Sequence, residues 1–337
     1  MKIAIIGAGA IGNLVAGYLA LKDEEVYLVG SPDTVSAVKK NGLKISGIRG
    51  VHKVHVNISE RLTVKPDLAV ISTKTQDIET AIKDNLDFLK DTTVLTAQNG
   101  IQADDLVAKY IPKDNIISSI VMFGATYLEP GKVVHNFEGS WIVGKIFQTN
   151  PDEELINISL VLDKAFPVII SQEIKGMKYL KIFVNANNCI SAILGVSMQE
   201  AFLDLEVSRI SIAIWKEGFE IISKLGIKLV SIPGFPVENL TKLTSMPCTE
   251  AAKVFSGIMT NLSKDPLYGS ILQSIKRARV SEIDYINGEF VNLAKQNSLS
   301  APLNEKLVSM VHEIERTHKF YAKEQFISEV KDLIPQW

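Results

Sequence analysis

Short apolar runs alternate with helix-like patterns through the first half of the chain, which predicts a mostly parallel β-sheet with helices on both faces. The run Leu68-Ala69-Val70-Ile71 is typical of a strand that is buried on both sides. A turn at Glu129-Pro130-Gly131 joins 120–127 to 133–137, so we expect an antiparallel pair at the edge of this sheet. Further strands are expected at 2–6, 25–29, 68–73 and 93–98, with helices from about residue 11 and over 33–40.

The pattern changes after residues 168–170, and from residue 173 onward almost all of the periodicity is helical. Gly226 stands where a glycine would end a helix, and a long helix is expected from about Ser270 past Ile286. We therefore expect two domains, an α/β domain over 1–172 and an all-α domain over 173–337. Apolar residues recur at helical spacing at Ile210, Ile214, Ile221, Ile222 and Leu225, and a loop is expected around Pro233, Pro236 and Pro247.

A glycine-rich loop follows the first predicted strand and opens the first predicted helix. It reads Gly7-Ala8-Gly9-Ala10-Ile11-Gly12, and this is the setting in which G-x-G-x-x-G binds a dinucleotide. Gly7 permits the tight turn, Gly9 lets a pyrophosphate approach the backbone, and Gly12 allows close packing of helix on strand. Backbone N–H groups and the helix dipole would hold the phosphates. The alternative is a glycine-rich turn that binds nothing.

The end of the second predicted strand leaves the choice of dinucleotide open. It reads Val29-Gly30-Ser31-Pro32, without the acidic residue that usually holds the ribose hydroxyls of NAD. Asp33 is the nearest acid, but Pro32 at a first helical position favours a helix-start role for it. No Arg stands there for a 2′-phosphate, although Ser31 could donate one hydrogen bond to such a group.

One helical face in the second half carries polar residues in otherwise apolar surroundings. Lys181 and Asn185 are four residues apart, and in a regular helix Asn188 lies within about 20° of Lys181, whereas Cys189 lies about 80° away. Burial there would lower the lysine pKa from about 10.4, as a proton donor near neutral pH requires. The alternative is a lysine whose ammonium reaches solvent.

The composition agrees with two domains and argues against a nucleic-acid-binding, membrane-binding or disulfide-rich protein. The chain has 337 residues, of which 46% are hydrophobic and 22% charged, and a domain takes roughly 150 residues. The formal net charge is −2, so neither nucleic acid nor an anionic membrane is expected as a partner. Two cysteines, Cys189 and Cys248, exclude a disulfide framework and fit a reducing compartment.

The apolar stretch over 3–21 has the length of a signal peptide or a short membrane span. Gly7, Gly9 and Gly12 interrupt it, and no small-residue cleavage site or second apolar span follows. We therefore expect a soluble cytoplasmic protein. The helical half could present a dimer face, although the sequence contains no decisive patch for one.

Other polar positions are weaker signals when taken alone. Asn99 and Gly100 follow the strand predicted at 93–98, at the strand end where open α/β sheets bind ligands, and the alternative is a plain turn. Glu282 and Asp284 are two residues apart in a predicted helix, so only one of them is expected to serve a site. His312 and His318 are six residues apart, on different helix faces, which argues against a metal site.

Taken together, these residues resemble the 2-dehydropantoate 2-reductases (ketopantoate reductases), and the resemblance covers essentially the whole chain. The resemblance implies a Rossmann-like N-terminal domain, an all-α C-terminal domain, and an active site between them. The matching residues are Gly7 to Gly12, Lys74-Thr75-Gln76, Gln98-Asn99-Gly100, Lys181 with Asn185, Ser270, and the specific stretch Glu282-Ile283-Asp284-Tyr285-Ile286-Asn287-Gly288.

The implied activity is NADPH-dependent reduction of 2-dehydropantoate to (R)-pantoate, a step toward pantothenate and coenzyme A. By resemblance, Lys181 is the general acid, and Glu282 orients the substrate and the lysine. Asn99 lies near the nicotinamide and the substrate, and Lys74 contacts the cofactor together with Ser31 and the glycine loop. The implied substrate-holding residues are Asn99, Asn185, Asn188 and Ser270.

Three positions depart from the family pattern. Ser31 stands where the family usually has Arg, so the cofactor is expected to be NADP(H) with NAD(H) as the alternative. Cys189 stands where the family has Asn, with Asn188 one residue earlier as a replacement, and Leu267 stands where another Asn is expected. A sister reductase for a more apolar branched 2-oxo acid is therefore the alternative function, and a nucleotide sensor without chemistry is a third.

Overall fold

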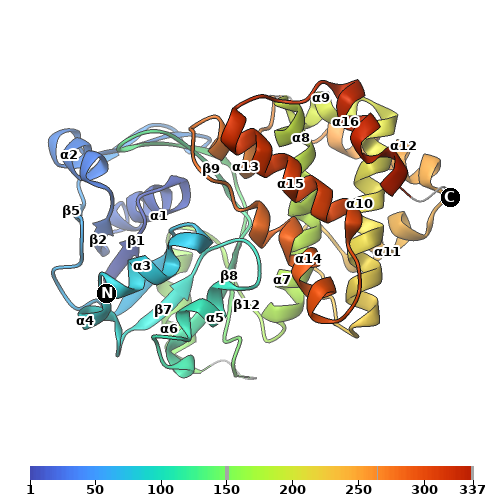
Figure 1. Ribbon diagram of the computed structural model, residues 1–337. Coiled ribbons are helices and arrows are strands. Elements are labelled where there is room, and N and C mark those ends of the chain that lie inside the picture. The colour runs from blue at the N-terminus through green and yellow to red at the C-terminus, as the bar shows by residue number, and fades with distance from the viewer. Residues whose placement is uncertain (149–151, 264, 335–337) are drawn as a thin grey trace. The chain divides into compact units, whose positions relative to one another are not determined.

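Buried apolar strands form the centre of the N-terminal unit, Met1–Lys175, whereas helices make up the C-terminal unit, Gly176–Trp337. A computed structural model describes residues 1–148, 152–263 and 265–334 (Figure 1). The expected fold class is confirmed, with an α/β unit that has a mostly parallel sheet followed by an all-α unit.

Eight strands form the main sheet in the order β12-β11-β8-β7-β6-β1-β2-β5. From β8 to β5 the neighbouring strands are parallel, while β11 is antiparallel to β8 and parallel to β12. The strands are β1 (Lys2–Ile6), β2 (Glu25–Val29), β5 (Asn57–Ser59), β6 (Leu68–Ile71), β7 (Thr93–Thr96), β8 (Ile116–Val121), β11 (Trp141–Gly144) and β12 (Val168–Ile170).

Alternate side chains of the central strands enter two separate cores, one on each face of the sheet. On β1, Ile3 and Ile5 pack into one core, and Ala4 and Ile6 into the other. Every residue of β6 is buried, as its continuous apolar run predicts. The helices of this unit are α1 (Ala10–Ala20), α2 (Pro32–Asn41), α3 (Ile78–Lys83), α4 (Leu86–Leu89), α5 (Ala103–Val107) and α6 (Glu153–Asp163), with 3-10 turns η1 (Thr75–Asp77) and η2 (Lys113–Asn115).

A second sheet of four strands has the order β4-β3-β10-β9. The antiparallel pair expected around the turn at 129–131 is present, but its placement at the edge of the main sheet is wrong, because both strands belong to this second sheet. The chain leaves the main sheet after β8, where Phe123 turns inward and stacks on Phe166 with ring centroids 3.7 Å apart. The strands are β3 (Leu43–Gly47), β4 (His52–Val54), β9 (Gly124–Glu129) and β10 (Lys132–Phe137).

An aromatic cluster joins the second sheet to helix α1. The Tyr18 hydroxyl lies 3.0 Å from Nδ1 of the buried His135 on β10. The Arg49 guanidinium lies over the Tyr18 ring, 4.7 Å from its centroid, and donates two hydrogen bonds of 2.6 Å to Glu138. The pKa of His135 is lowered, chiefly because burial disfavours its charged form.

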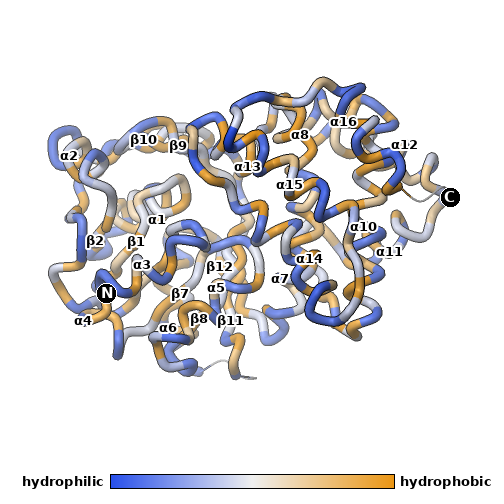
Figure 2. Tube along the Cα trace, in the orientation of Figure 1, coloured by the Kyte–Doolittle hydropathy of each residue, from blue (hydrophilic) through white to orange (hydrophobic). Residues whose placement is uncertain are grey.

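Ten helices and two 3-10 turns occupy the described residues from 174 onward. In Figure 2 their hydrophilic and hydrophobic stretches alternate along the trace, as amphipathic helices require. The elements are α7 (Ile174–Ala186), α8 (Asn188–Leu194), α9 (Met198–Phe202), α10 (Leu205–Lys224), α11 (Val237–Ser245), α12 (Cys248–Thr260), α13 (Ser270–Ile275), η3 (Ile283–Tyr285), α14 (Asn287–Gln296), α15 (Pro302–Thr317), α16 (Lys323–Val330) and η4 (Lys331–Leu333).

Helix α10 is the longest described helix, and its ends follow the sequence signals. The Asp204 carboxylate accepts hydrogen bonds from two first-turn N–H groups, those of Glu206 (2.9 Å) and Val207 (3.3 Å). The helix ends at Lys224, and Gly226 follows in the left-handed region with φ +63°. The prediction that Gly226 ends this helix is therefore confirmed.

Two expectations for residues 233–286 are wrong. Residues 237–260 are not a loop, because Pro236 and Pro247 stand directly before α11 and α12, where a proline is compatible with a helix start. The long helix expected from Ser270 past Ile286 ends at Ile275. Ala278 has φ +51°, and the N–H of Arg279 donates to the Ser274 carbonyl, which closes the helix end.

Within the described part of the chain, no helix is both long enough and apolar enough to span a bilayer.

Candidate functional site

The glycine loop between β1 and α1 is shaped by contacts that leave no room for side chains. Gly7 has φ +113°, and a Cβ there would lie 2.5 Å from the backbone nitrogen of Thr73. A Cβ on Gly12 would lie 1.9 Å from the carbonyl oxygen of Gly7. Gly9 differs, because a Cβ there would meet no atom within 4 Å. The loop therefore packs tightly on the strand side and is open in front of Gly9.

The open side of the loop is the amino end of α1. Gly9 is the N-cap residue, no side chain caps the helix, and its first turn contains no acidic residue. First-turn N–H groups have no partner within a helix, and the helix dipole adds positive potential at this end. The loop from Gly7 through Ala8, Gly9, Ala10 and Ile11 to Gly12 thus fits the pyrophosphate of a dinucleotide.

The other expected cofactor residues follow the carboxyl ends of three parallel strands. Ser31 follows β2, Lys74 follows β6, and Asn99 follows β7, so all of them lie at one edge of the main sheet. Gln98 ties two of these ends together, because its side-chain amide donates 2.9 Å hydrogen bonds to the carbonyls of Ile71 and Thr73. Within the N-terminal unit, the structure thus brings the expected residues to the edge where such sheets bind ligands.

The C-terminal unit carries the expected proton donor. Lys181 and Asn185 lie one turn apart on α7, and burial lowers the pKa of Lys181 from 10.5 to about 8. A lysine with this pKa is mostly protonated at neutral pH and can donate a proton there. The continuous helix expected through Cys189 is wrong, because α7 ends at Ala186 and α8 begins at Asn188.

The break between α7 and α8 changes the neighbours of the next two residues. Asn188 packs against the residue before α13, since a Cβ on Gly269 would lie 3.0 Å from the Asn188 Cβ. This contact places Asn188 beside Ser270, the first residue of α13. Cys189 is fully buried, with Asn287 hydrogen-bonded to its thiol, and burial raises the thiol pKa to about 12. Cys189 therefore belongs to the interior of the unit.

The stretch that begins at Glu282 is not helical at its start. Glu282 precedes the 3-10 turn η3, and the regular helix α14 begins only at Asn287. The two acids have different surroundings, because Asp284 lies 3.0 Å from Nε2 of His312. The Leu267 backbone is held by the Gln199 side chain, which accepts a 2.9 Å hydrogen bond from the Leu267 N–H.

Two buried polar residues near Lys181 were not among the expected site residues. Lys178 is buried and stands three residues before Lys181, so the spacing 178, 181, 185 could have identified one polar helix face. Asn187 is buried at the helix break, and among the described residues its side-chain amide has no hydrogen-bond partner. No sequence signal marks this residue, because the break itself was not predicted.

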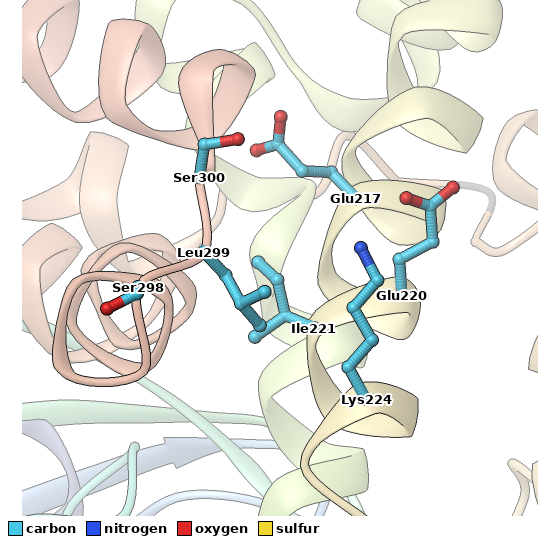
Figure 3. Close-up of a pocket in the computed structure, with 7 residues that line it drawn as sticks. All are labelled: Glu217, Glu220, Ile221, Lys224, Ser298, Leu299 and Ser300. Atoms are coloured by element: carbon cyan, nitrogen blue, oxygen red, sulfur yellow. The ribbon is translucent and has the colours of Figure 1, made fainter.

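A cavity of about 350 Å³ in the C-terminal unit contains none of the expected site residues. Figure 3 shows Glu217, Glu220 and Lys224 on α10 facing the segment that holds Ser298 and Ser300. Glu217 caps the start of α15. Its carboxylate accepts hydrogen bonds from the backbone N–H groups of Leu303 (3.0 Å) and Asn304 (2.8 Å), and from the Asn304 side chain (2.8 Å).

The described residues contain no group of three or more His, Cys, Asp or Glu side chains that could hold a metal ion.

Family models and relatives cover nearly the whole chain. Residues 3–148 match the model described as ketopantoate reductase PanE/ApbA, and residues 173–315 match its C-terminal counterpart. A 2-dehydropantoate 2-reductase of Pyrococcus horikoshii is 32% identical over 314 residues, covering 92% of this chain and 96% of that protein. The corresponding protein of Lactococcus lactis is 25% identical over 330 residues, covering 95% and 99%.

Solved structures show the same fold. D-mandelate dehydrogenase with NADH and anilino(oxo)acetate is 25% identical, with a TM-score of 0.79 and coverage of 94% of this chain and 99% of that one. A PanE/ApbA family ketopantoate reductase from Ralstonia eutropha is 24% identical, with the same TM-score and coverage, and supports the fold alone. Because family models match both halves and a relative is 32% identical along almost its full length, the chain belongs to the ketopantoate reductase PanE/ApbA family of oxidoreductases.

Proposed function

We propose that the protein reduces the 2-oxo group of 2-dehydropantoate to the hydroxyl group of (R)-pantoate, using a reduced nicotinamide dinucleotide. NADPH is the donor that the family resemblance implies, and NADH is the alternative. The observation that carries the proposal is Lys181, whose pKa is lowered to about 8 by burial on a helix shared with Asn185. Relatives that carry the name 2-dehydropantoate 2-reductase align over more than 90% of the chain, which supports this substrate.

The proposed reaction needs one hydride and one proton. A bound reduced nicotinamide would supply the hydride to the carbonyl carbon, and negative charge would then develop on the carbonyl oxygen. In this proposal the Lys181 ammonium faces that oxygen, stabilises the developing charge, and donates a proton from Nζ to form the hydroxyl group. Lys181 is left neutral and regains a proton from solvent before the next turnover.

The remaining residues have binding and positioning roles in this proposal. The glycine loop from Gly7 to Gly12 and Lys74 hold the dinucleotide, with Asn99 next to the nicotinamide and the substrate. Residues 1–172 act as the dinucleotide-binding domain and residues 173–337 as the substrate domain. Asn185, Asn188 and Ser270 hold the 2-oxo acid, and Glu282 orients the substrate and Lys181. The packing of Asn188 beside Ser270 supports their joint role.

A second candidate is a sister reductase that acts on another branched 2-oxo acid. Cys189 favours it, because this residue is buried in the interior where the family has an amide that could hold a substrate hydroxyl group. The similarity to D-mandelate dehydrogenase, solved with anilino(oxo)acetate, points in the same direction.

One assay grid separates these candidates. NADPH and NADH are each combined with 2-dehydropantoate and a panel of other 2-oxo acids, and kcat/KM is measured from nicotinamide oxidation. The proposal expects 2-dehydropantoate to give the highest kcat/KM with either donor. A higher value for a different branched 2-oxo acid would establish the sister reductase, and the absence of oxidation with every acid would refute both.

A further inference from the structure

The tip of β2 carries an acidic side chain that makes no hydrogen bond or ion pair within the described part of the N-terminal unit. Helix α2 begins at Pro32, with Ser31 as its N-cap residue and Asp33 in its first turn. The Ser31 hydroxyl is 3.1 Å from that of the buried Thr34 and caps no backbone N–H group. Asp33 is exposed, and within residues 1–148 its carboxylate has no hydrogen-bond or ion-pair partner. Asp33 is therefore free to accept a hydrogen bond from a ligand.

The neighbouring strand tip adds a second carboxylate to the same edge. The N–H of Gly30 donates a 3.1 Å hydrogen bond to the carbonyl of Ser59, the last residue of β5. Glu60 follows directly, is exposed, and also has no partner among the described side chains. Arg61 comes next, but its guanidinium lies 3.1 Å from the Asp84 carboxylate. The two strand tips thus carry two unpaired acids and one base that is already paired.

The position of Asp33 relative to the glycine loop indicates which ligand group it meets. Strand β2 is the parallel neighbour of β1, which feeds the glycine loop. In dinucleotide-binding sheets of this kind, the ribose of the adenosine half lies beyond the tip of the second strand, where a carboxylate holds its 2′-hydroxyl. Lys74 follows β6, which lies on the opposite side of β1 from β2.

We propose that Asp33 accepts a hydrogen bond from the 2′-hydroxyl of the adenosine ribose, and that the protein consequently binds NADH in preference to NADPH. The inference rests on the proposed function, because it assumes that the glycine loop holds a nicotinamide dinucleotide. It assigns the cofactor class and names the residue that selects it.

Electrostatics opposes a 2′-phosphate at this position, and the helix end nearby does little to offset the repulsion. Its negative charge would meet the carboxylates of Asp33 and Glu60, and the guanidinium that follows β5, that of Arg61, is already paired with Asp84. The amino end of α2 offers little compensation, since Pro32 has no N–H group and Asp33 already complements the helix dipole. An unphosphorylated ribose avoids the repulsion and donates its hydroxyl proton to the carboxylate.

The test measures cofactor affinity without substrate, by fluorescence titration of the intact protein with NADH and with NADPH. The wild type is expected to bind NADH at least about 10-fold more tightly than NADPH. Asp33→Asn should weaken NADH binding about 10-fold, which is the usual contribution of a hydrogen bond to a charged group. The affinities for NADH and NADPH should then become similar. Ser31→Arg, which supplies a guanidinium at the tip of β2, should strengthen NADPH binding about 10-fold.

Glu153→Gln is the matched control. Glu153 is an exposed first-turn acid of α6, which follows β11, and the antiparallel pairing of β11 with β8 places its carboxyl end at the opposite edge of the sheet. This variant should leave both affinities unchanged, and the melting temperatures of all variants show whether each one folds.

Three results would contradict the inference in different ways. Tighter binding of NADPH than of NADH by the wild type would overturn the preference and leave the proposed function standing. Unchanged NADH affinity in a folded Asp33→Asn variant would overturn the role of Asp33. Failure of the wild type to bind either dinucleotide would refute the proposed function itself.

Discussion

Gly12 lies so close to Gly7 that a Cβ at Gly12 would sit 1.9 Å from the Gly7 carbonyl oxygen. The Ser72 hydroxyl supports the same contact, because it donates a 2.8 Å hydrogen bond to that oxygen. The first turn of α1 is therefore held against the strand that precedes it. Gly7 and Gly12 are therefore required by the fold, whereas a Cβ on Gly9 would meet no atom within 4 Å, and we propose that Gly9 is the glycine required for dinucleotide binding.

Replacing these glycines one at a time should separate folding from binding. Gly12→Ala places a methyl group against backbone and is expected to lower the free energy of unfolding by about 1–3 kcal/mol or more. Gly9→Ala meets no atom within 4 Å, and Gly9 has φ −85°, which any residue adopts. We expect Gly9→Ala to keep the wild-type melting temperature and to weaken dinucleotide binding at least about 10-fold. Thermal unfolding and cofactor titration of both variants check this, and a destabilised Gly9→Ala variant would contradict it.

The stability of the N-terminal unit should depend on the protonation of His135. Its pKa lies below 6.5, mainly because burial disfavours the charged imidazole, and its Nδ1 lies 3.0 Å from the Tyr18 hydroxyl. The unfolded chain then binds more protons than the folded chain below about pH 6.5, so stability falls as the pH drops into that range. Arg49 and Glu138 are the charged groups that face this cluster.

Urea unfolding at pH 7.5 and 5.5 measures this effect. His135→Gln removes the titrating group, so the loss of stability between the two pH values should be smaller than in the wild type. His55→Gln, at an exposed position, is the control and should behave as the wild type. Equal pH dependence in all three proteins would show that His135 does not contribute.

Glu217 should stabilise the C-terminal unit through the start of α15. Glu217→Ala removes three hydrogen bonds to Leu303 and Asn304, so we expect a loss of about 1–3 kcal/mol in the free energy of unfolding. Glu220 lines the same cavity from the same helix and is exposed, so Glu220→Ala should change stability by less than about 0.5 kcal/mol. Denaturant unfolding of both variants tests the difference, and equal losses would contradict the capping role.

The parts of the molecule that local patterns determine were predictable from the sequence. The continuous burial of β6, the glycine loop and the end of α10 at Gly226 follow from neighbouring residues alone. The second sheet was not predictable, because Phe123 leaves the main sheet to stack on Phe166, a partner more than forty residues away in the chain. Such long-range packing overrides the local pattern.

The same distinction applies to the candidate site. Lys181, Asn185 and the residues at the strand ends were proposed from spacing and resemblance, and their roles stay predictions. The helix break at Asn187 was missed, since residues 179–189 show no proline or glycine signal for it. The end of α13 was missed for a related reason, because Ala278 adopts a left-handed conformation that sequence rules reserve for glycine and asparagine.

Lys181 should destabilise the folded protein at neutral pH. The pKa of Lys181 is about 8 in the folded chain, whereas in the unfolded chain it has the ordinary value of 10.5. Between pH 8 and 10.5 the unfolded chain therefore binds more protons than the folded chain. Wild-type stability therefore rises with pH from about 8 to 10.5, and the charged lysine is destabilising below that range. Lys181→Met should raise the melting temperature by a few degrees at pH 7, with a smaller gain at pH 10. A lower melting temperature at pH 7 would contradict buried charge at this residue.

The pH dependence of kcat/KM for 2-dehydropantoate reduction tests the role of Lys181 most directly. A general acid must be protonated, so the wild-type rate should hold below about pH 8 and fall tenfold per pH unit above it. Lys181→Ala should be slower by about 10²–10⁴-fold and should lack this limb, with dinucleotide affinity unchanged. A near-normal rate in Lys181→Ala, or the same alkaline limb in both proteins, would contradict the assignment of Lys181 as the proton donor.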